Sequence, residues 1–147
     1  MRHALILHGL LVTTMWLAPV PSFGNGGRPV TASLSGGDAI PSGDPDGSGE
    51  AFVTANFGQR EVCFQLSVSD IASATLAHIH KAPYGQNGPV VVALIPPSSG
   101  FSSGCVNGVS QDLILDLLRT PDDFYINVHN TDYPAGAVRG QLQNPNF

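Results

Sequence analysis

The stretch Phe52-Val53-Thr54-Ala55-Asn56-Phe57, with Gly58-Gln59-Arg60 and Val62-Cys63-Phe64-Gln65-Leu66-Ser67-Val68 behind it, decides the fold class of this 147-residue chain. Apolar residues recur with a period of two on both sides of a short turn. That period places every second side chain on the same side of an extended chain. Two such runs joined by a turn that contains glycine predict a β-hairpin. Antiparallel sheet is therefore the first expectation.

Further strand-like segments lie on both sides of this hairpin. Downstream, the pattern predicts strands at residues 75–80, 89–95, 123–129 and 137–143. Upstream, residues 25–49 are rich in glycine and proline, with one short apolar alternation at Val30, Ala32 and Leu34. We interpret this region as a flexible lead-in, one edge strand and a long turn.

One helix interrupts the strands. Residues 111–119 carry apolar side chains at 113, 114, 117 and 118, which form one face of a short helix. Ser110 suits the N-cap, and Thr120-Pro121 ends the helix. Many short strands with glycine and proline turns indicate an all-β, antiparallel β-sandwich with one short helix in a loop insertion.

The first 24 residues have the form of a secretory signal peptide. Arg2 precedes an apolar run over residues 4–18, and the small residues Ser22 and Gly24 follow Pro21. Cleavage there would leave residues 25–147 as a single domain that begins at Asn25. No later segment is apolar over the roughly 20 residues that a membrane-spanning helix needs. We expect a secreted protein, periplasmic or extracellular, without a membrane span.

Charge and cysteine content narrow the function classes. Residues 25–147 contain five basic and eleven acidic side chains, a formal charge of −6, so nucleic acid is a poor candidate partner. Cys63 and Cys105 are an even pair in an exported chain, for which a disulfide is the simplest interpretation. The alternative is a metal or redox site. A disulfide would stabilise the fold by about 4 kcal/mol on the chain-entropy estimate.

Three histidines remain after cleavage, and they fall in two predicted strands. His78 and His80 are two residues apart, so their side chains share a side of the strand, with alpha carbons about 6.6 Å apart. Two imidazoles can converge from that spacing on one ion at about 2.0–2.1 Å. His129 lies on the later strand, on the side opposite Phe124, Ile126 and Val128. Imidazole is the commonest protein ligand for copper and zinc, so these three residues are candidate metal ligands.

Arg139 is placed near the histidines by an expected hairpin register. If the turn at 130–136 sets His129 opposite Ala137, then Asn127 opposes Arg139, and Arg139 lies diagonal to His129. Simpler roles stay open for all of these residues. The histidines could hydrogen-bond to backbone, and Arg139 could form a structural salt bridge with Asp132 or Asp123.

Several motifs together resemble the CHRD domain. They are His78-Ile79-His80, residues 88–94, Gly104-Cys105, residues 125–130, Tyr133-Pro134, Gly136 and residues 138–142. This family is named after chordin, where it is an extracellular repeat, and it also forms single secreted domains. The resemblance covers about residues 29–143. It implies a secreted β-sandwich but no agreed biochemical activity.

A second resemblance is local. The His-x-His strand, the later Val128-His129 and an arginine near the C-terminus are similar to the copper site of the copper/zinc superoxide dismutases, which are β-sandwiches with a disulfide. The resemblance implies copper ligands at His78, His80 and His129, and a catalytic, anion-guiding role for Arg139. No further histidines or aspartate cluster supply a bridging ligand or separate zinc site, so the centre would be copper-only.

Two functional hypotheses follow. The first is an exported mononuclear copper protein with superoxide dismutase-like activity, whose substrate is superoxide or another small anion. The second is a non-enzymatic extracellular or envelope binding module with structural histidines and a protein partner. The sequence has no H-E-x-x-H motif, no phosphate-binding glycine loop before a helix and no recognisable serine–histidine–aspartate spacing, so hydrolase and nucleotide-dependent functions rank low.

Overall fold

The computed structural model describes residues 26–145, so the predicted signal peptide and the cleavage point before Asn25 lie outside the described residues. Eight strands and two short helices follow in chain order: β1 (Arg28–Ser35), β2 (Ser48–Asn56), β3 (Glu61–Ser69), β4 (Leu76–Lys81), β5 (Val90–Leu94), β6 (Phe101–Asn107), α1 (Gln111–Arg119), the 3-10 helix η1 (Pro121–Asp123), β7 (Phe124–His129) and β8 (Val138–Gln141).

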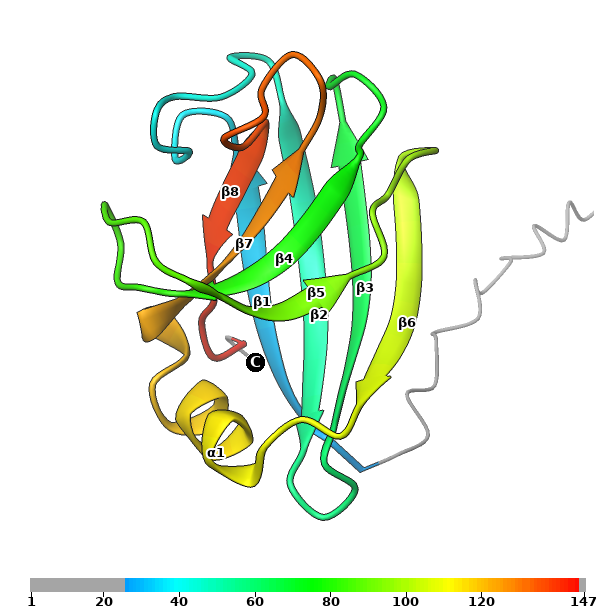
Figure 1. Cartoon of the computed structure of the whole chain (residues 1–147), viewed down its shortest axis with the longest axis vertical. Coiled ribbons are helices and arrows are strands. Elements are labelled where there is room, and N and C mark those ends of the chain that lie inside the picture. Colours follow the sequence, from blue (N-terminus) through cyan, green and yellow to red (C-terminus); the bar gives the residue numbers. More distant parts are fainter. Residues whose placement is uncertain (1–25, 146–147) are drawn as a thin grey trace, which may run out of the picture.

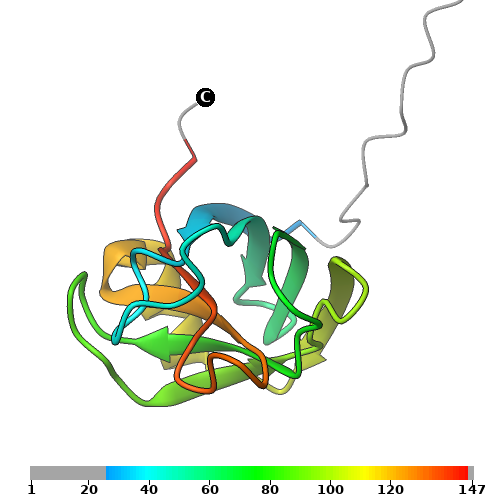
Figure 2. The same cartoon turned by 90° about the horizontal axis from the view of Figure 1, so that it is seen from above.

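The strands form one antiparallel sheet that folds over itself into two layers. Their order is β5-β4-β7-β8-β1-β2-β3-β6. Figure 1 shows β4, β5 and β7 crossing in front of β1, β2 and β3, and Figure 2 shows the two layers from above. The predicted all-β sandwich with one short helix is confirmed, with both layers belonging to one continuous sheet.

The hairpin that decides the fold class forms as predicted. Strands β2 and β3 pair along their whole length, from Ser48 opposite Ser69 to Asn56 opposite Glu61. The other four predicted strands are present with ends that shift by at most two residues, and α1 spans the predicted helix. The Ser110 hydroxyl accepts a hydrogen bond from the Leu113 amide, which is the expected N-cap contact.

The first strand is not at an edge, which corrects the expectation from the sequence. β1 lies between β8 and β2, because Ser35 pairs with Arg139 and Thr31 with Gln143 on the side away from β2. A glycine permits this close approach: a Cβ added at Gly140 would lie 2.2 Å from the Ser33 carbonyl oxygen. The actual edges of the sheet are β5 and β6.

The core lies between the two layers. Val30, Val53 and Phe64 come from one layer, and Ile79 and Ile126 from the other; all five are at most 1% exposed. Helix α1 covers one end of the two layers and inserts Ile114 and Leu117 into the same core (Figure 1). The alternation of apolar residues in each strand therefore leaves the opposite side of each layer for polar groups.

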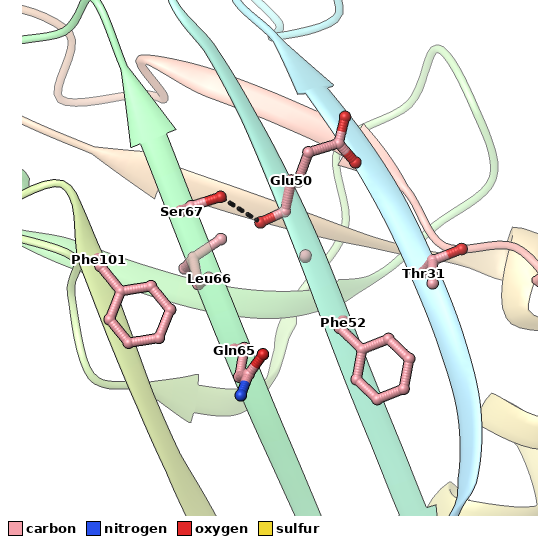
Figure 3. A pocket seen from close by; sticks show the side chains of 8 residues that line it. Thr31, Glu50, Phe52, Gln65, Leu66, Ser67 and Phe101 are labelled. Carbon is pink, nitrogen blue, oxygen red and sulfur yellow. Dashed lines mark hydrogen bonds between the residues drawn. The ribbon is translucent and has the colours of Figure 1, made fainter. Parts of the chain in front are cut away.

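The outer side of the layer β1-β2-β3-β6 carries a shallow pocket of about 270 Å³. Figure 3 shows the rings of Phe52 and Phe101 on either side of it, with Gln65 between them. Phe101 is 54% exposed. No residue in the lining is basic.

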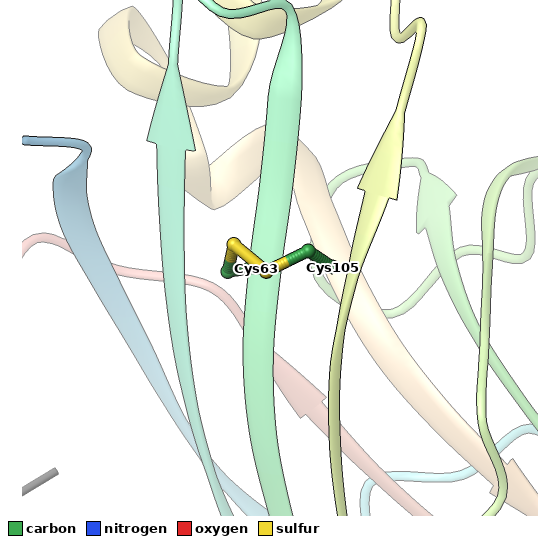
Figure 4. Close-up of a disulfide and its surroundings, with 2 residues drawn as sticks. All are labelled: Cys63 and Cys105. Carbon is green, nitrogen blue, oxygen red and sulfur yellow. A yellow bond between two sulfur atoms is a disulfide. The ribbon is translucent and has the colours of Figure 1, made fainter. Parts of the chain in front are cut away.

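The predicted disulfide between Cys63 and Cys105 is present (Figure 4). The two residues are directly opposite one another on β3 and β6, and their alpha carbons are 3.9 Å apart. Among the described residues, no strand hydrogen-bonds to the other edge of β6. The disulfide therefore ties an edge strand to the rest of the sheet.

Within residues 26–145, no helix has both the length and the apolar character needed to cross a membrane.

Candidate metal site

The site lies on the outer side of the layer that contains β4, β7 and β8. Phe124, Ile126 and Val128 of β7 point into the core, so the residues that alternate with them point outward. The outward side chains of the three strands form one continuous polar face: His78 and His80 from β4, Tyr125, Asn127 and His129 from β7, and Arg139 and Gln141 from β8.

The register places these residues as the sequence predicts. Asn127 pairs with Arg139 on one side and with His78 on the other. Val128 opposes Val138 in the core, so the turn at 130–136 sets the expected hairpin. The structure confirms that His78 and His80 share one side and that His129 and Arg139 share another strand face, and the pairing of β4 with β7 brings the two pairs onto the same face of the layer.

The three imidazoles converge. The Nδ1 atom of His78 lies 3.3 Å from Nε2 of His129, and ring nitrogens of all three residues lie within 4.8 Å of one another. The His78 ring is edge-on to both other rings, with ring centroids 5.6 Å from His80 and 5.2 Å from His129. His80 and His129 are buried, and His78 is the half-buried member.

Backbone carbonyls fix the protonation of two of the rings. Nδ1 of His80 is 2.9 Å from the Gly88 oxygen, and Nδ1 of His129 is 3.0 Å from the Pro134 oxygen. A carbonyl oxygen only accepts, so each Nδ1 carries the proton and donates it. Each neutral ring therefore keeps its lone pair on Nε2. This arrangement is typical of histidine metal ligands, whose second nitrogen donates to a carbonyl or carboxylate.

One of these lone pairs has no partner. Nε2 of His80 is buried and makes no hydrogen bond within the described part of the chain. A buried polar atom without a partner costs free energy, about 1–3 kcal/mol, and such atoms are rare in native proteins. The side chain of Asn127 has a second such atom, Oδ1, while its Nδ2 donates to the Ala135 oxygen.

Burial favours the neutral form of His78 and His80. Burial lowers the pKa of His78, and the neighbouring His129 and His80 lower it further. Burial also lowers the pKa of His80, with smaller contributions in the same direction from His129 and Arg139; the hydrogen bond to Gly88 opposes this shift. The pKa values of His78 and His80 are thus shifted toward the neutral form, which is the form of imidazole that binds metal ions.

The donor set fits a small transition-metal ion. Two nitrogens bound to one ion at about 2.1 Å are at most about 4.2 Å apart. The nitrogens of His78 and His129, 3.3 Å apart, already meet this limit. No pair of the three ligand nitrogens is more than 4.8 Å apart, so a pair at that distance would have to approach by about half an ångström. With these spacings, the three residues fit a three-histidine site.

Arg139 does not contact the histidines. Its guanidinium is 1% exposed and lies 3.6 Å from the centre of the Tyr125 ring. It donates to Asn87 Oδ1, the Pro83 oxygen and Gln141 Oε1. Within residues 26–145 neither Asp123 nor Asp132 forms a salt bridge with it, so that alternative is wrong. The anion-binding role stays a prediction.

Two parts of the site, Tyr125 and the segment 82–89, were not predicted from the sequence. Tyr125 stacks on His80 with ring centroids 4.7 Å apart and an angle of 7°. The segment 82–89 supplies the Gly88 carbonyl and covers Arg139, although its glycine and proline indicate only a turn. The outward position of Tyr125 was visible in the alternation of β7, but backbone carbonyls as partners leave no signal in side-chain identities.

A protein-family model matches most of the chain. The match is to the CHRD domain and covers residues 30–142. This range contains the three histidines, Arg139 and both cysteines. No curated protein and no solved structure matches the chain.

Proposed function

The chain belongs to the CHRD domain family, and we propose that its three converging histidines bind one copper ion in an exported protein. Membership of this family supports a role as an extracellular binding module. The single observation that carries this proposal is the buried Nε2 of His80, which has no partner among the described residues and belongs to a cluster whose ring nitrogens lie within 4.8 Å of one another.

The donor set favours copper. All three ligands are neutral imidazoles, and among the described residues the cluster includes no carboxylate or thiolate. Imidazole suits both copper and zinc, and copper binds more strongly than zinc to a given nitrogen site. Bound copper would supply one-electron chemistry between Cu(I) and Cu(II), by which two superoxide anions and two protons become dioxygen and hydrogen peroxide.

The surrounding residues suit a small anionic substrate such as superoxide. The formal charge of the whole chain is −5, which repels anions, so a local positive charge is needed to attract them. Arg139 supplies that charge from beneath Tyr125. Because it is buried, it acts through its field and not by contact. His78 is the most exposed ligand and marks the side open to solvent.

A second candidate function is a non-enzymatic extracellular or envelope module with a protein partner. The backbone hydrogen bonds of His80 and His129 favour it, because they also suit structural histidines. The exposed Phe101 beside the pocket of the other layer offers a contact surface that is independent of the histidines.

Metal content of the exported protein tests the proposal. Copper and zinc are measured in the oxidised protein and in a His78→Ala/His80→Ala double variant. We expect about one copper per chain, lost in the variant. Absence of both metals from the wild type after incubation with each would overturn the metal site and leave the binding module.

A further inference from the structure

We propose that residues 82–89 form a strap that fixes the tautomer of His80, and that Tyr125 and Arg139 are the positioning residues that hold this strap. The relevance of the strap to metal binding rests on the proposed function. The fixing of the tautomer does not, because it is a property of the metal-free protein.

The contacts around Gly88 form a closed set. Its carbonyl oxygen accepts the Nδ1 proton of His80 at 2.9 Å, and its amide donates to the Tyr125 hydroxyl at 3.2 Å. The Tyr125 ring in turn stacks on the His80 ring. Tyr125 therefore holds His80 twice, directly through its ring and indirectly through the peptide that receives the His80 proton.

Side chains of β8 anchor the other strap residues. Arg139 donates to the Pro83 oxygen at 3.4 Å and to Asn87 Oδ1 at 3.3 Å. Gln141 Nε2 donates to the Ala82 oxygen at 2.8 Å. These anchors come from the outward side of β8. The strap is thus bound along its length to side chains of the same polar face as the histidines.

Tyr125 lies between two partners, His80 and Arg139. Strand β7 lies between β4 and β8 in the sheet, so His80 and Arg139 approach the Tyr125 ring from opposite sides. A guanidinium over an aromatic ring is attracted by the ring's electrons. Arg139 therefore packs against the Tyr125 ring, which stacks on His80, and its hydrogen bonds to Pro83 and Asn87 hold the strap.

Gly88 allows the strap to lie this close. A Cβ added there would lie 2.0 Å from the Lys81 carbonyl oxygen and 2.9 Å from the Ala82 Cβ. The Lys81 amide donates to the Pro89 oxygen at 3.1 Å, which closes the strap back onto β4. Glycine is thus required by close packing of backbone on backbone.

The strap therefore leaves the lone pair of the His80 ring on one nitrogen, Nε2. With the strap in place, the His80 proton stays on Nδ1 and the lone pair on Nε2 faces the cluster. Without it, the proton distributes between both nitrogens and the ring rotates. Loss of such an outer partner typically lowers metal affinity about 10–100-fold.

Arg139→Lys separates this role from attraction of an anion. Lysine keeps the positive charge, but it has no planar fork to reach Pro83, Asn87 and Gln141 together. Tyr125→Phe keeps the ring and removes only the acceptor for the Gly88 amide. Arg28→Lys, at an exposed position, is the matched control.

The test is nitrogen NMR of the histidine rings in the metal-free protein at a pH above 7, where the imidazoles are neutral. We expect one Nδ1-protonated tautomer for His80 in the wild type and in Arg28→Lys, and a mixture in Arg139→Lys and Tyr125→Phe. We also expect faster amide exchange at Gly88 in both. An unchanged tautomer in both variants would overturn the proposal. If Arg139→Lys fails to fold, the near-isosteric Tyr125→Phe decides alone.

Copper affinity of the same proteins links the strap to the metal site. We expect dissociation constants about 10–100-fold weaker in the two strap variants than in Arg28→Lys. A wild type that binds no metal would refute the proposed function while leaving the tautomer result standing. Unchanged affinity with a changed tautomer would overturn the link between them.

Discussion

Nδ1 of His78 donates a hydrogen bond to Nε2 of His129 across 3.3 Å, although the two residues are 51 positions apart in the chain. The direction follows from His129, whose Nδ1 carries the proton that it donates to the Pro134 oxygen, so that its Nε2 must accept. In the metal-free protein the two rings therefore hold each other. An ion that takes both nitrogens replaces this single proton.

Acid should destabilise the fold through His78 and His80. Their pKa values are lowered in the folded state, mainly by burial, so the unfolded chain binds more protons once the pH falls below about 6.5. Their contribution to stability is complete above that pH, and falls as the pH drops toward the folded pKa values. We expect a smaller pH dependence of the free energy of unfolding in His78→Gln, measured by urea unfolding of metal-free protein between about pH 5 and 7.5. An equal dependence would contradict this.

Removal of the disulfide should destabilise the protein and release β6. In Cys63→Ser/Cys105→Ser we expect a loss of about 2–4 kcal/mol in the free energy of unfolding. Amide exchange should accelerate most along β6, because this edge strand is hydrogen-bonded to the sheet through β3 on one side. Ser103→Ala, also exposed on β6, serves as the control. Uniform acceleration across the sheet would argue against a local role.

Gly140→Ala should disturb the junction between the two layers. The added methyl group would lie 2.2 Å from the Ser33 carbonyl oxygen, and backbone on both sides limits relaxation. We expect destabilisation of about 1–3 kcal/mol, measured by urea unfolding. Gly58→Ala is the matched control, since its nearest neighbour would be 3.6 Å away. Similar losses in both variants would show that the approach of β8 to β1 tolerates a side chain.

Attraction of an anion by Arg139 predicts a salt-dependent rate in the copper-loaded protein. Arg139→Gln should dismutate superoxide more slowly than Arg28→Gln at low salt, and the difference should shrink as salt screens the field. Arg139→Lys should keep the salt dependence. An unchanged rate at low salt in Arg139→Gln, at equal copper content, would remove the attracting role.

The histidine face could be predicted because it depends on two local rules. Alternation along β7 separates Ile126 from Asn127, and the turn at 130–136 fixes which residue of β8 lies opposite Asn127. These rules were enough to bring Arg139 onto the side of His129. The pairing of β4 with β7 follows from the whole sheet, and only the structure shows that the rings converge.

Other features give weak sequence signals. Strand β6 is mostly exposed, so Phe101-Ser102-Ser103-Gly104 lacks the apolar alternation that reveals a half-buried strand. The interior position of β1 depends on β8, more than a hundred residues away. The strap at 82–89 is held largely through main-chain atoms of Ala82, Pro83 and Gly88, which leave no signal in side-chain identities.

The pairing of β4 with β7 brings together histidines that lie far apart in the chain. His129 reaches His78 only after the chain between them has closed a long loop, and contacts of that kind form slowly. Of the three histidines, an unfolded chain holds only the neighbouring pair His78 and His80 close together. Under the proposed function, all three histidines would bind an ion only after β4 has paired with β7. A bound ion would therefore mark a chain whose sheet is complete.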